Sequence, residues 1–272
     1  MAEKRVLITG ATDGIGMQTA VRLAEKGFEV WIHGRNYDKV EWVKESVIEK
    51  THNENIFGIA ADFSSLYEVK SMVIELKNLV DSFDVIINNA GIINLAFERT
   101  VDGFERTFQV NYLSHFLLTS QLLPMMKEKF DARIINLTSM IHADSFDENN
   151  LQVNNANDYA AEQVYSNTKL YNILFTFKLA RMLQGSTITA NCLHPGVINT
   201  KLLRASYGDI GMPVESGADT SVFLASSPDI ESVSGRYFAN SRISKASPVC
   251  YDKECQDILW NKSLDILGNY LQ

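Results

Sequence analysis

The chain has 272 residues, of which 46% are hydrophobic and 21% are charged, the balance of an ordinary globular protein that can bury a sizeable core. Its formal net charge is −8, and no cluster of Lys or Arg interrupts this acidic balance. Because binding to nucleic acid depends on positive charge facing the phosphate backbone, the composition argues against a nucleic-acid partner.

The cysteines and the amino terminus indicate a reducing compartment. Cys192, Cys250 and Cys255 form no CxxC motif and no Cys/His ligand set, so we expect free thiols. The opening MAEKRVLITG passes from a few polar residues directly into a strand-like segment, unlike a signal peptide. No apolar run approaches the ~18 residues that span a bilayer. We therefore expect a cytoplasmic protein without a membrane span.

Short β-branched runs alternate along the chain with longer amphipathic stretches. The first runs are apolar almost throughout, as in parallel strands that are covered on both faces. The expected strands are residues 5–10, 29–34, 56–62, 84–91, 133–140, 187–196 and 235–239, and the expected helices include 17–26, 66–80, 103–126 and 160–183.

No linker or internal repeat divides the chain, so we expect a single dinucleotide-binding catalytic domain over residues 1–272. Repeated β-α-β units with right-handed crossovers predict an α/β Rossmann fold, a doubly wound parallel sheet of seven strands. The functional crevice of such a sheet lies at the carboxyl ends of its strands.

The first expected strand runs directly into TGATDGIG, which places three glycines in a turn before a helix. Glycines let the backbone approach a pyrophosphate closely, and the helix N-terminus offers unpaired N–H groups and a positive dipole end. A tight turn without a ligand is the alternative, but three glycines in seven residues favour a dinucleotide site. The expected contacts in this loop are Gly10, Thr12, Asp13, Gly14, Ile15 and Gly16.

The end of the second expected strand, WIHGRNYD, bears on the choice between the two nicotinamide cofactors. NAD-binding sites usually place Asp or Glu here, where it accepts hydrogen bonds from the ribose 2′-OH. Arg35 and Asn36 stand at this place, and the guanidinium of Arg35 matches a 2′-phosphate instead. The sequence therefore favours NADP(H). NAD(H) stays an alternative, because Asp38 is close by and Arg35 could be an ordinary surface residue.

Two later segments have more than one interpretation. In VYSNTKLYN (164–172), Tyr165 precedes Lys169 by four residues, which puts both side chains on one face of a helix. This spacing suits a lysine that stabilises a phenolate, and it equally suits two unrelated surface residues. Residues 197–215 are loosely patterned, and they predict either a substrate lid beside the crevice or a mere connector.

Six motifs occur in order along the chain, each at an expected strand end or helix turn. They are TGATDGIG (9–16), NNAG (88–91), Asn111 in QVNYLSH, Ser139 in INLTSM, YSNTK (165–169) and HPGVINT (194–200). Together they resemble the motif series of the classical short-chain dehydrogenase/reductases. The chain is most similar to the retinol dehydrogenase branch and its WW-domain-oxidoreductase relatives, through YSNTKLYNILFTFKLARML, CLHPGVINT and the C-terminal GRYFANSRISKASP.

The resemblance implies a catalytic set of Asn111, Ser139, Tyr165 and Lys169. Tyr165 would be the general acid in reduction and the base in oxidation. Lys169 and the charge of the nicotinamide ring would bring its pKa from ~10 toward neutrality. Lys169 would also bind the nicotinamide ribose, Ser139 would donate to the substrate oxygen, and Asn111 would hold a water that relays protons to Lys169.

The resemblance also implies how a cofactor would lie. The third strand end would hold the adenine, the NNAG segment the adenosine ribose, and the HPGVINT segment the carboxamide. The expected contacts beyond the glycine loop are Arg35, Asn36, Asp62, Phe63, Asn89, Ala90, Gly91, Tyr165, Lys169, Pro195, Gly196, Val197 and Thr200. His142 and His194 lack a second ligand at metal spacing, so we expect them to be structural or to line the pocket, and we expect no metal site.

The sequence departs from the family pattern at two places. Asp13 stands where many NADP-preferring members carry a basic residue. The N-terminal membrane segment of several retinol dehydrogenases is missing, which argues against a membrane-dissolved retinoid as substrate.

The sequence thus predicts an NADP(H)-dependent oxidoreductase that interconverts an alcohol and a carbonyl by hydride transfer. The apolar side chains of segment 197–215 indicate a substrate larger than a simple alcohol, such as a retinoid, a steroid or a xenobiotic carbonyl. The alternative is a non-catalytic dinucleotide-binding sensor or scaffold on the same fold. Because the family often dimerises through its long helices, a homodimer through residues 103–126 and 160–183 is a further expectation. The apolar side chains in question are Leu202, Leu203, Tyr207, Ile210 and Met212.

Overall fold

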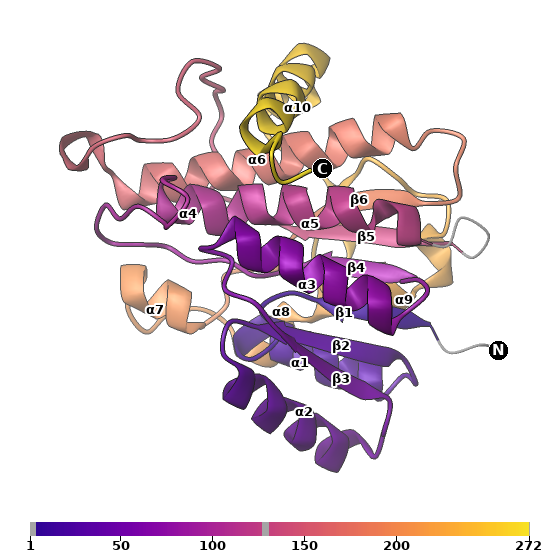
Figure 1. The fold of residues 1–272 in the computed structure, drawn as a ribbon. Coiled ribbons are helices and arrows are strands. Elements are labelled where there is room, and N and C mark those ends of the chain that lie inside the picture. The colour runs from indigo at the N-terminus through magenta and orange to yellow at the C-terminus, as the bar shows by residue number, and fades with distance from the viewer. Residues whose placement is uncertain (1–3, 127–130, 272) are drawn as a thin grey trace.

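A single sheet with helices on both faces makes up the computed structural model, which describes residues 4–126 and 131–271 (Figure 1). Within these residues the sheet has eight strands in the order β3-β2-β1-β4-β5-β6-β7-β8. The strands are β1 (Arg5–Ile8), β2 (Glu29–Gly34), β3 (Ile56–Ala60), β4 (Val85–Asn88), β5 (Arg133–Leu137), β6 (Thr189–His194), β7 (Tyr237–Ala239) and β8 (Arg242–Ser244). The α-helices are α1 (Gly14–Ala24), α2 (Tyr37–Thr51), α3 (Leu66–Leu79), α4 (Arg106–Phe108), α5 (Ser114–Leu122), α6 (Ala161–Met182), α7 (Lys201–Tyr207), α8 (Val214–Gly217), α9 (Asp219–Ser226) and α10 (Lys253–Leu267).

The predicted doubly wound Rossmann fold is confirmed, with a correction to the number of strands. The seven predicted strands are present and run parallel, but an eighth strand, β8, pairs antiparallel with β7. Asn240 and Ser241 connect the two, with φ angles of 51° and 56°. Two consecutive residues with positive φ form the type I′ turn that suits a tight hairpin. The sequence does not predict this hairpin, because Ser241 is not a glycine and the returning strand has only three residues.

Two hydrophobic layers hold the helices against the sheet. Alternate residues of β1 face opposite layers: Leu7 lies in the layer under α3, α5 and α6, whereas Val6 and Ile8 lie in the layer under α1, α2 and α9. All three side chains are fully buried, as expected for a strand at the middle of a covered parallel sheet. The carboxyl ends of β1, β4, β5 and β6 share one edge of the sheet.

The predicted continuous helix over residues 103–126 is wrong in its middle and at its start. The single turn α4 gives way to a π-helical turn at Gln109–Leu113, and regular α-helix resumes in α5. At this turn the Asn111 side chain accepts a hydrogen bond from the Ile92 N–H (2.8 Å) and donates one to the Ile92 carbonyl (2.9 Å). Turns of this kind often occur at functional sites. Here the turn fixes a loop beside the edge of the sheet that the carboxyl ends of the central strands share.

The C-terminal helix α10 lies across the outer side of α5 and α6 (Figure 1). The Trp260 ring stacks on Phe175, with centroids 5.9 Å apart, and also contacts Phe116 at 4.9 Å. The hydroxyls of Tyr112 and Ser263 are hydrogen-bonded at 2.7 Å. The chain's own C-terminal helix therefore covers apolar surface on α5 and α6 that the sequence offers as a dimer interface. The homodimer itself stays a prediction.

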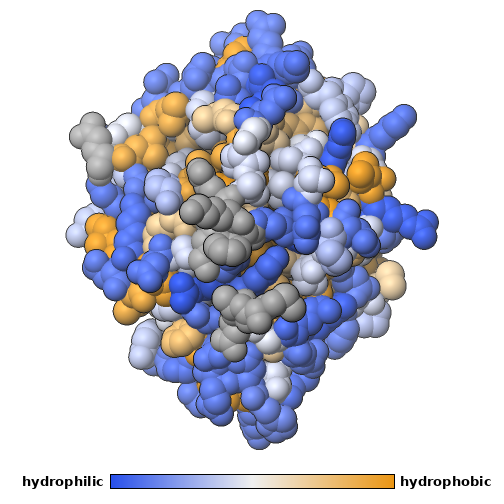
Figure 2. Space-filling view, turned by 90° about the vertical axis from the view of Figure 1, so that its right-hand side faces the viewer, coloured by the Kyte–Doolittle hydropathy of each residue, from blue (hydrophilic) through white to orange (hydrophobic). Residues whose placement is uncertain are grey.

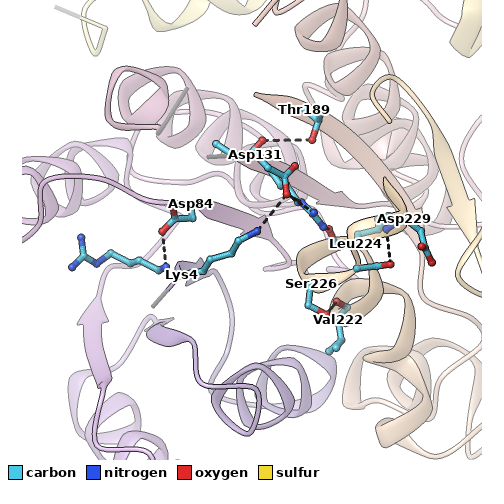
Figure 3. Close-up of polar contacts among 12 residues, drawn as sticks. Lys4, Asp84, Asp131, Thr189, Val222, Leu224, Ser226 and Asp229 are labelled. Carbon is cyan, nitrogen blue, oxygen red and sulfur yellow. Dashed lines mark hydrogen bonds and ion pairs between the residues drawn. The ribbon is translucent and has the colours of Figure 1, made fainter. Parts of the chain in front are cut away.

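A network of ion pairs and hydrogen bonds links distant segments at the amino ends of the strands (Figure 3). Arg133, which is 2% exposed, donates from Nε to Asp131 (2.9 Å) and from Nη1 to the Leu224 carbonyl (2.8 Å). Lys4 reaches the same Asp131 carboxylate at 3.3 Å. The network ties β5 to α9 and to the residue before β1, at the end of the sheet opposite the carboxyl ends of the strands.

The molecular face seen in Figure 2 is mainly hydrophilic with small, separate hydrophobic patches. Among residues 4–126 and 131–271, no helix combines the length and the apolarity that crossing a membrane requires.

We expect Arg133→Leu to lower the free energy of unfolding by about 3 kcal/mol, because it removes both guanidinium hydrogen bonds to Oδ2 of the largely buried Asp131 carboxylate. Lys4→Leu removes a more exposed partner of the same carboxylate and should cost less than about 1 kcal/mol. Urea unfolding followed by circular dichroism measures both values. Equal losses in the two variants would show that the buried arginine is not the centre of the network.

Candidate active site

A cavity of about 440 Å³ opens at the edge where the carboxyl ends of the central strands meet. It brings together most of the residues that the sequence predicts for a dinucleotide and for catalysis. Those that line it are Gly10, Thr12, Asp13, Gly14, Ile15, Gly16, Arg35, Asp62, Phe63, Asn89, Ala90, Gly91, Ser139, Tyr165, Lys169, Pro195, Gly196 and Thr200.

Three predicted site residues do not line this cavity. The Asn36 side chain caps α2 instead, by accepting a hydrogen bond from the Lys39 N–H at 2.8 Å. Val197 is 43% exposed on the outside of its loop. Asn111 is fully buried and stands behind the lining, within reach of Gly91.

The glycine turn approaches the loop after β4 so closely that side chains are excluded. A Cβ on Gly16 would lie 2.4 Å from the Gly10 carbonyl oxygen, and a Cβ on Gly10, whose φ is +63°, would lie 2.7 Å from Cα of Ala90. Asn89 closes the contact by donating from Nδ2 to the carbonyls of Thr9 (2.7 Å) and Gly10 (3.1 Å). The bare backbone ahead of α1 is a cradle that fits a pyrophosphate.

Asp13, the departure from the family pattern, is balanced by two lysines. Its carboxylate caps α1 through the Gly14 N–H (2.8 Å) and forms ion pairs with Lys201 and with Lys39 (3.6 Å). Partial burial raises the pKa of Asp13, but the hydrogen bonds from Lys201 and Gly14 prevail and hold it below its usual range. The negative charge in the glycine loop is therefore offset by neighbouring positive charge.

His33 is a cavity residue that the sequence analysis does not identify. Its Nδ1 accepts from the Gly10 N–H (3.2 Å), and its Nε2–H donates to the Ala61 carbonyl (3.0 Å). Its ring stacks on Phe63 at 4.3 Å. Burial lowers the pKa of His33 to about 4, so the ring is neutral at neutral pH and can accept that N–H. The available signal in the sequence was a histidine directly after the apolar run of residues 30–32 in β2.

The four predicted catalytic residues come from three segments, and three of them, Ser139, Tyr165 and Lys169, line the cavity. Tyr165 and Lys169 share a face of α6, with Lys169 Nζ 5.3 Å from the centroid of the phenol ring. Ser139 follows β5 and presents its hydroxyl to the phenol. Asn111 lies beside them, since its Nδ2 also contacts the Thr168 hydroxyl at 3.2 Å.

Burial dominates the ionisation of the Tyr165–Lys169 pair. It raises the pKa of Tyr165 to about 12, which a hydrogen bond with the Ser139 hydroxyl only partly opposes. It lowers the pKa of Lys169 to about 8, and Nζ turns to the Leu137 carbonyl at 3.3 Å. In the chain by itself the phenol pKa is thus above that of free tyrosine, because a buried phenolate loses its hydration. The lowering expected from Lys169 together with the nicotinamide charge stays a prediction.

Apolar side chains make up much of the rest of the cavity wall. Segment 197–215 contributes to this wall through α7. At the start of α7, Lys201 forms an ion pair with Asp13, and at its end the Tyr207 hydroxyl donates to Glu162 of α6 (2.7 Å). Sequence reasoning missed several of these wall residues because they lie in the irregular loop after β4 and in the interrupted helix. The wall residues are the mainly apolar Ile92, Ile93, Val110, Ile141, Leu202, Leu203 and Tyr207, with one cation, Arg106.

We expect Lys169→Met to stabilise the fold at pH 7 by about 2 kcal/mol. The folded pKa of Lys169, about 8, lies below its ordinary value of 10.5, so below pH ~8 the fold bears the full cost of a buried ammonium. That cost is about 3 kcal/mol, less about 1 kcal/mol for the lost hydrogen bond to Leu137. The unfolded chain binds more protons between these pH values, so the advantage of the variant should shrink as pH rises from about 8 to about 10.5.

Urea unfolding of parent and variant at several pH values measures this difference. Lys178→Met on the same helix, which removes a cation paired with Asp257, is the matched control and should show no such gain. A stability difference for Lys169→Met that does not change over this pH range would contradict the buried-ammonium explanation.

Comparison with known proteins agrees with this geometry. Residues 4–210 match the family model described as short chain dehydrogenase. Human retinol dehydrogenase 14 is 36% identical over 295 residues, covering 98% of this chain and 87% of that protein. Human polyprenol dehydrogenase is 34% identical over 284 residues, covering 98% and 86%. A solved blue fluorescent protein from a metagenomic library, in complex with NADPH, superposes with a TM-score of 0.70 at 25% identity, covering 87% of this chain and 96% of that one. The chain is therefore an oxidoreductase acting on CH–OH and C=O groups, and it belongs to the short-chain dehydrogenase family, in its retinol-dehydrogenase-like branch.

Proposed function

We propose that this protein is an NADP(H)-dependent oxidoreductase that interconverts an alcohol and a carbonyl on an apolar substrate, with Tyr165 as its acid and base. One observation carries the proposal. A single cavity connects the glycine cradle, the Tyr165–Lys169–Ser139 group and an apolar wall. A cofactor with its pyrophosphate in the cradle and a substrate carbonyl against the wall would share this cavity with the phenol.

Tyr165 transfers the proton in this proposal. The nicotinamide, when bound, supplies or takes up the hydride. Because burial holds the pKa of Tyr165 at about 12, the residue is a neutral phenol at neutral pH and can give its proton to the substrate oxygen in reduction. Ser139 donates a hydrogen bond to the same oxygen. The Lys169 ammonium, near the phenol ring, offsets the negative charge that the departing proton leaves.

Asn111 acts from behind this group. The Asn111 side chain is hydrogen-bonded to the main-chain N–H and carbonyl of Ile92. The main-chain carbonyl of Asn111 accepts hydrogen bonds from Asn172 Nδ2 and His115 Nδ1, each at 3.1 Å. We assign it to holding the interrupted helix next to Lys169. The water relay that the family resemblance implies stays a prediction.

The preference for NADP(H) rests on charge at the end of β2. Arg35 lines the cavity there, and Lys39 lies close enough to the glycine loop to pair with Asp13. Arg35 stands at the position where an NAD site usually has an Asp or Glu. The solved structure with bound NADPH supports the same choice, because it shares this fold over most of the chain.

The preference for an apolar substrate rests on the walls beside Tyr165. Leu202 and Leu203 of α7 line the same cavity as Tyr165, together with Ile92 and Ile141. Beyond them, Ile210 and Met212 are 49% and 56% exposed, which extends the apolar surface outward. Two relatives bear retinol and polyprenol in their names. We therefore propose a retinoid-like or isoprenoid-like alcohol or aldehyde as the substrate class.

We expect Tyr165→Phe to lower kcat by a factor of about 100–10,000, because it removes the proton donor, and to leave the Kd for NADPH within about threefold. Parent and variant are assayed on a panel of aldehydes, ketones and alcohols, with binding followed by NADPH fluorescence. Tyr171→Phe, on the same helix but with its hydroxyl on the Leu151 carbonyl, is the control and should keep its activity. Unchanged turnover in Tyr165→Phe would refute the mechanism. NADPH binding without any turnover in the parent would favour the sensor or scaffold alternative.

We expect Arg35→Ala to raise the Kd for NADPH at least about tenfold, because charge-assisted hydrogen bonds to a phosphate are worth roughly 1.5–3 kcal/mol. The Kd for NADH should change by less than about twofold, since that cofactor has no 2′-phosphate. Titration calorimetry with both cofactors measures the two ratios. Equal losses for NADPH and NADH would contradict the assignment of Arg35 to the 2′-phosphate.

A further inference from the structure

We propose that His142 is a positioning residue for Ser139 and that it connects this serine to the C-terminal segment, residues 245–251. The inference deepens the proposed function and rests on the role given there to Ser139. Two histidines from different segments hold the peptide group that joins Ser139 to Met140, and a backbone amide of the C-terminal segment orients one of them.

The carbonyl end of this peptide group is held by His142. Its Nδ1 lies 2.7 Å from the Ser139 carbonyl oxygen, and its Nε2 lies 2.9 Å from the Ser247 nitrogen. The Tyr237 hydroxyl reaches the same carbonyl at 3.5 Å, and its ring lies against the imidazole with centroids 5.6 Å apart. Of the two hydrogen bonds to that carbonyl oxygen, the one from His142 is therefore the shorter.

The two partners of His142 determine its tautomer. A carbonyl oxygen can only accept a hydrogen bond, so Nδ1 carries the hydrogen that it donates to Ser139. A backbone amide can only donate, so Nε2 keeps the lone pair that accepts from the Ser247 N–H. If both ring nitrogens of His142 carried a hydrogen, the Nε2–H would point at the Ser247 N–H, and neither could accept a hydrogen bond from the other. The arrangement therefore needs a neutral imidazole of the Nδ1–H form.

The N–H end of the same peptide group is held by His194. The Met140 N–H donates to His194 Nδ1 at 3.2 Å. Burial lowers the pKa of His194 to about 4, so its ring is free to accept at neutral pH. With both ends of one peptide group bonded, the backbone cannot rotate after Ser139 without breaking two hydrogen bonds. The direction in which the Ser139 hydroxyl points toward Tyr165 is thereby restricted.

The C-terminal segment is itself firmly placed. Cys250 is fully buried, and its carbonyl accepts from Gln256 Nε2 of α10 at 2.8 Å. The Tyr251 ring packs on Phe177 of α6 with centroids 5.3 Å apart. The Ser247 N–H is thus positioned by the helix that carries Tyr165 and by the C-terminal helix. Through His142, residues more than 100 positions along the chain from Ser139 define its backbone.

Two substitutions at His142 separate positioning from simple filling of space. His142→Phe keeps a ring but loses the donor, and it should lower kcat about 10- to 100-fold while KM and the NADPH Kd stay within about threefold. His142→Asn places an amide N–H near the position of Nδ1–H, and it should recover at least about fivefold of the lost kcat. Tyr251→Phe, which removes a hydroxyl bonded to the neighbouring Ala246 N–H, is the control for loosening of the segment and should stay within about twofold of the parent.

A third substitution tests the link to the C-terminal segment. Ser247→Pro deletes the N–H from which His142 Nε2 accepts a hydrogen bond, and the φ of −55° at this position suits proline. It should lower kcat in the parent but have little further effect in His142→Phe, because both changes break the same chain of contacts. Additive losses in the double variant would overturn the link. So would a His142→Phe variant with the kcat of the parent.

Nitrogen-15 NMR of the His142 ring gives a readout that does not depend on turnover. The parent should show the Nδ1–H tautomer, and Ser247→Pro should weaken that preference. Finding the Nε2–H tautomer in the parent overturns the inference whatever the activity. If the parent shows the Nδ1–H tautomer yet turns over no member of the substrate panel, the arrangement of His142 is supported and the proposed function alone has failed. Thermal unfolding of each variant separates these effects from loss of the fold.

Discussion

The Thr9 hydroxyl, at the end of the glycine-bearing strand, is the contact on which the site depends. It accepts hydrogen bonds from the main-chain N–H groups of Asn89 (2.9 Å) and Ala90 (3.0 Å), and it donates one to Nε2 of His115 (2.9 Å). Nδ1 of His115 in turn donates to the Asn111 carbonyl (3.1 Å). One buried hydroxyl thus joins the glycine turn, the loop after β4 and the interrupted helix. Since an unpaired buried polar group is costly, none of these three segments can shift alone.

Burial sets the charge state of the groups around this contact. Burial lowers the pKa values of His33, His115 and His194 to about 4, 3 and 4, so the rings stay neutral and each can accept a hydrogen bond. The same burial leaves Tyr165 a neutral phenol and makes the Lys169 ammonium expensive. The histidines therefore hold the backbone in place, while the groups that move or stabilise a proton are the phenol and the amine. This division of roles costs stability at Lys169, as expected for a functional site.

Much of the fold and of the candidate site follows from local signals. The apolar strands, the glycine turn and the Tyr165–Lys169 spacing are short-range patterns, and parallel strands necessarily bring their carboxyl ends to one edge. The missed features depend on contacts between distant segments. The helix over residues 103–126 is interrupted where Asn111 bonds to Ile92, and the hairpin before β8 needs positive φ at two residues, neither of which is a glycine. His33 gave only the weak signal of a histidine directly after an apolar run.

By itself, the sequence determined the alternation of the first seven strands with helices, the place of the glycine cradle and most of the residues around its dinucleotide and catalytic parts. Those properties depend on residue type and spacing along a few turns of chain. Only the tertiary structure decided that the phenol pKa of Tyr165 rises, that α10 covers α5 and α6, and that His142 joins Ser139 to Ser247. Burial and long-range hydrogen bonds arise from segments that meet only after folding, and so no local pattern records them.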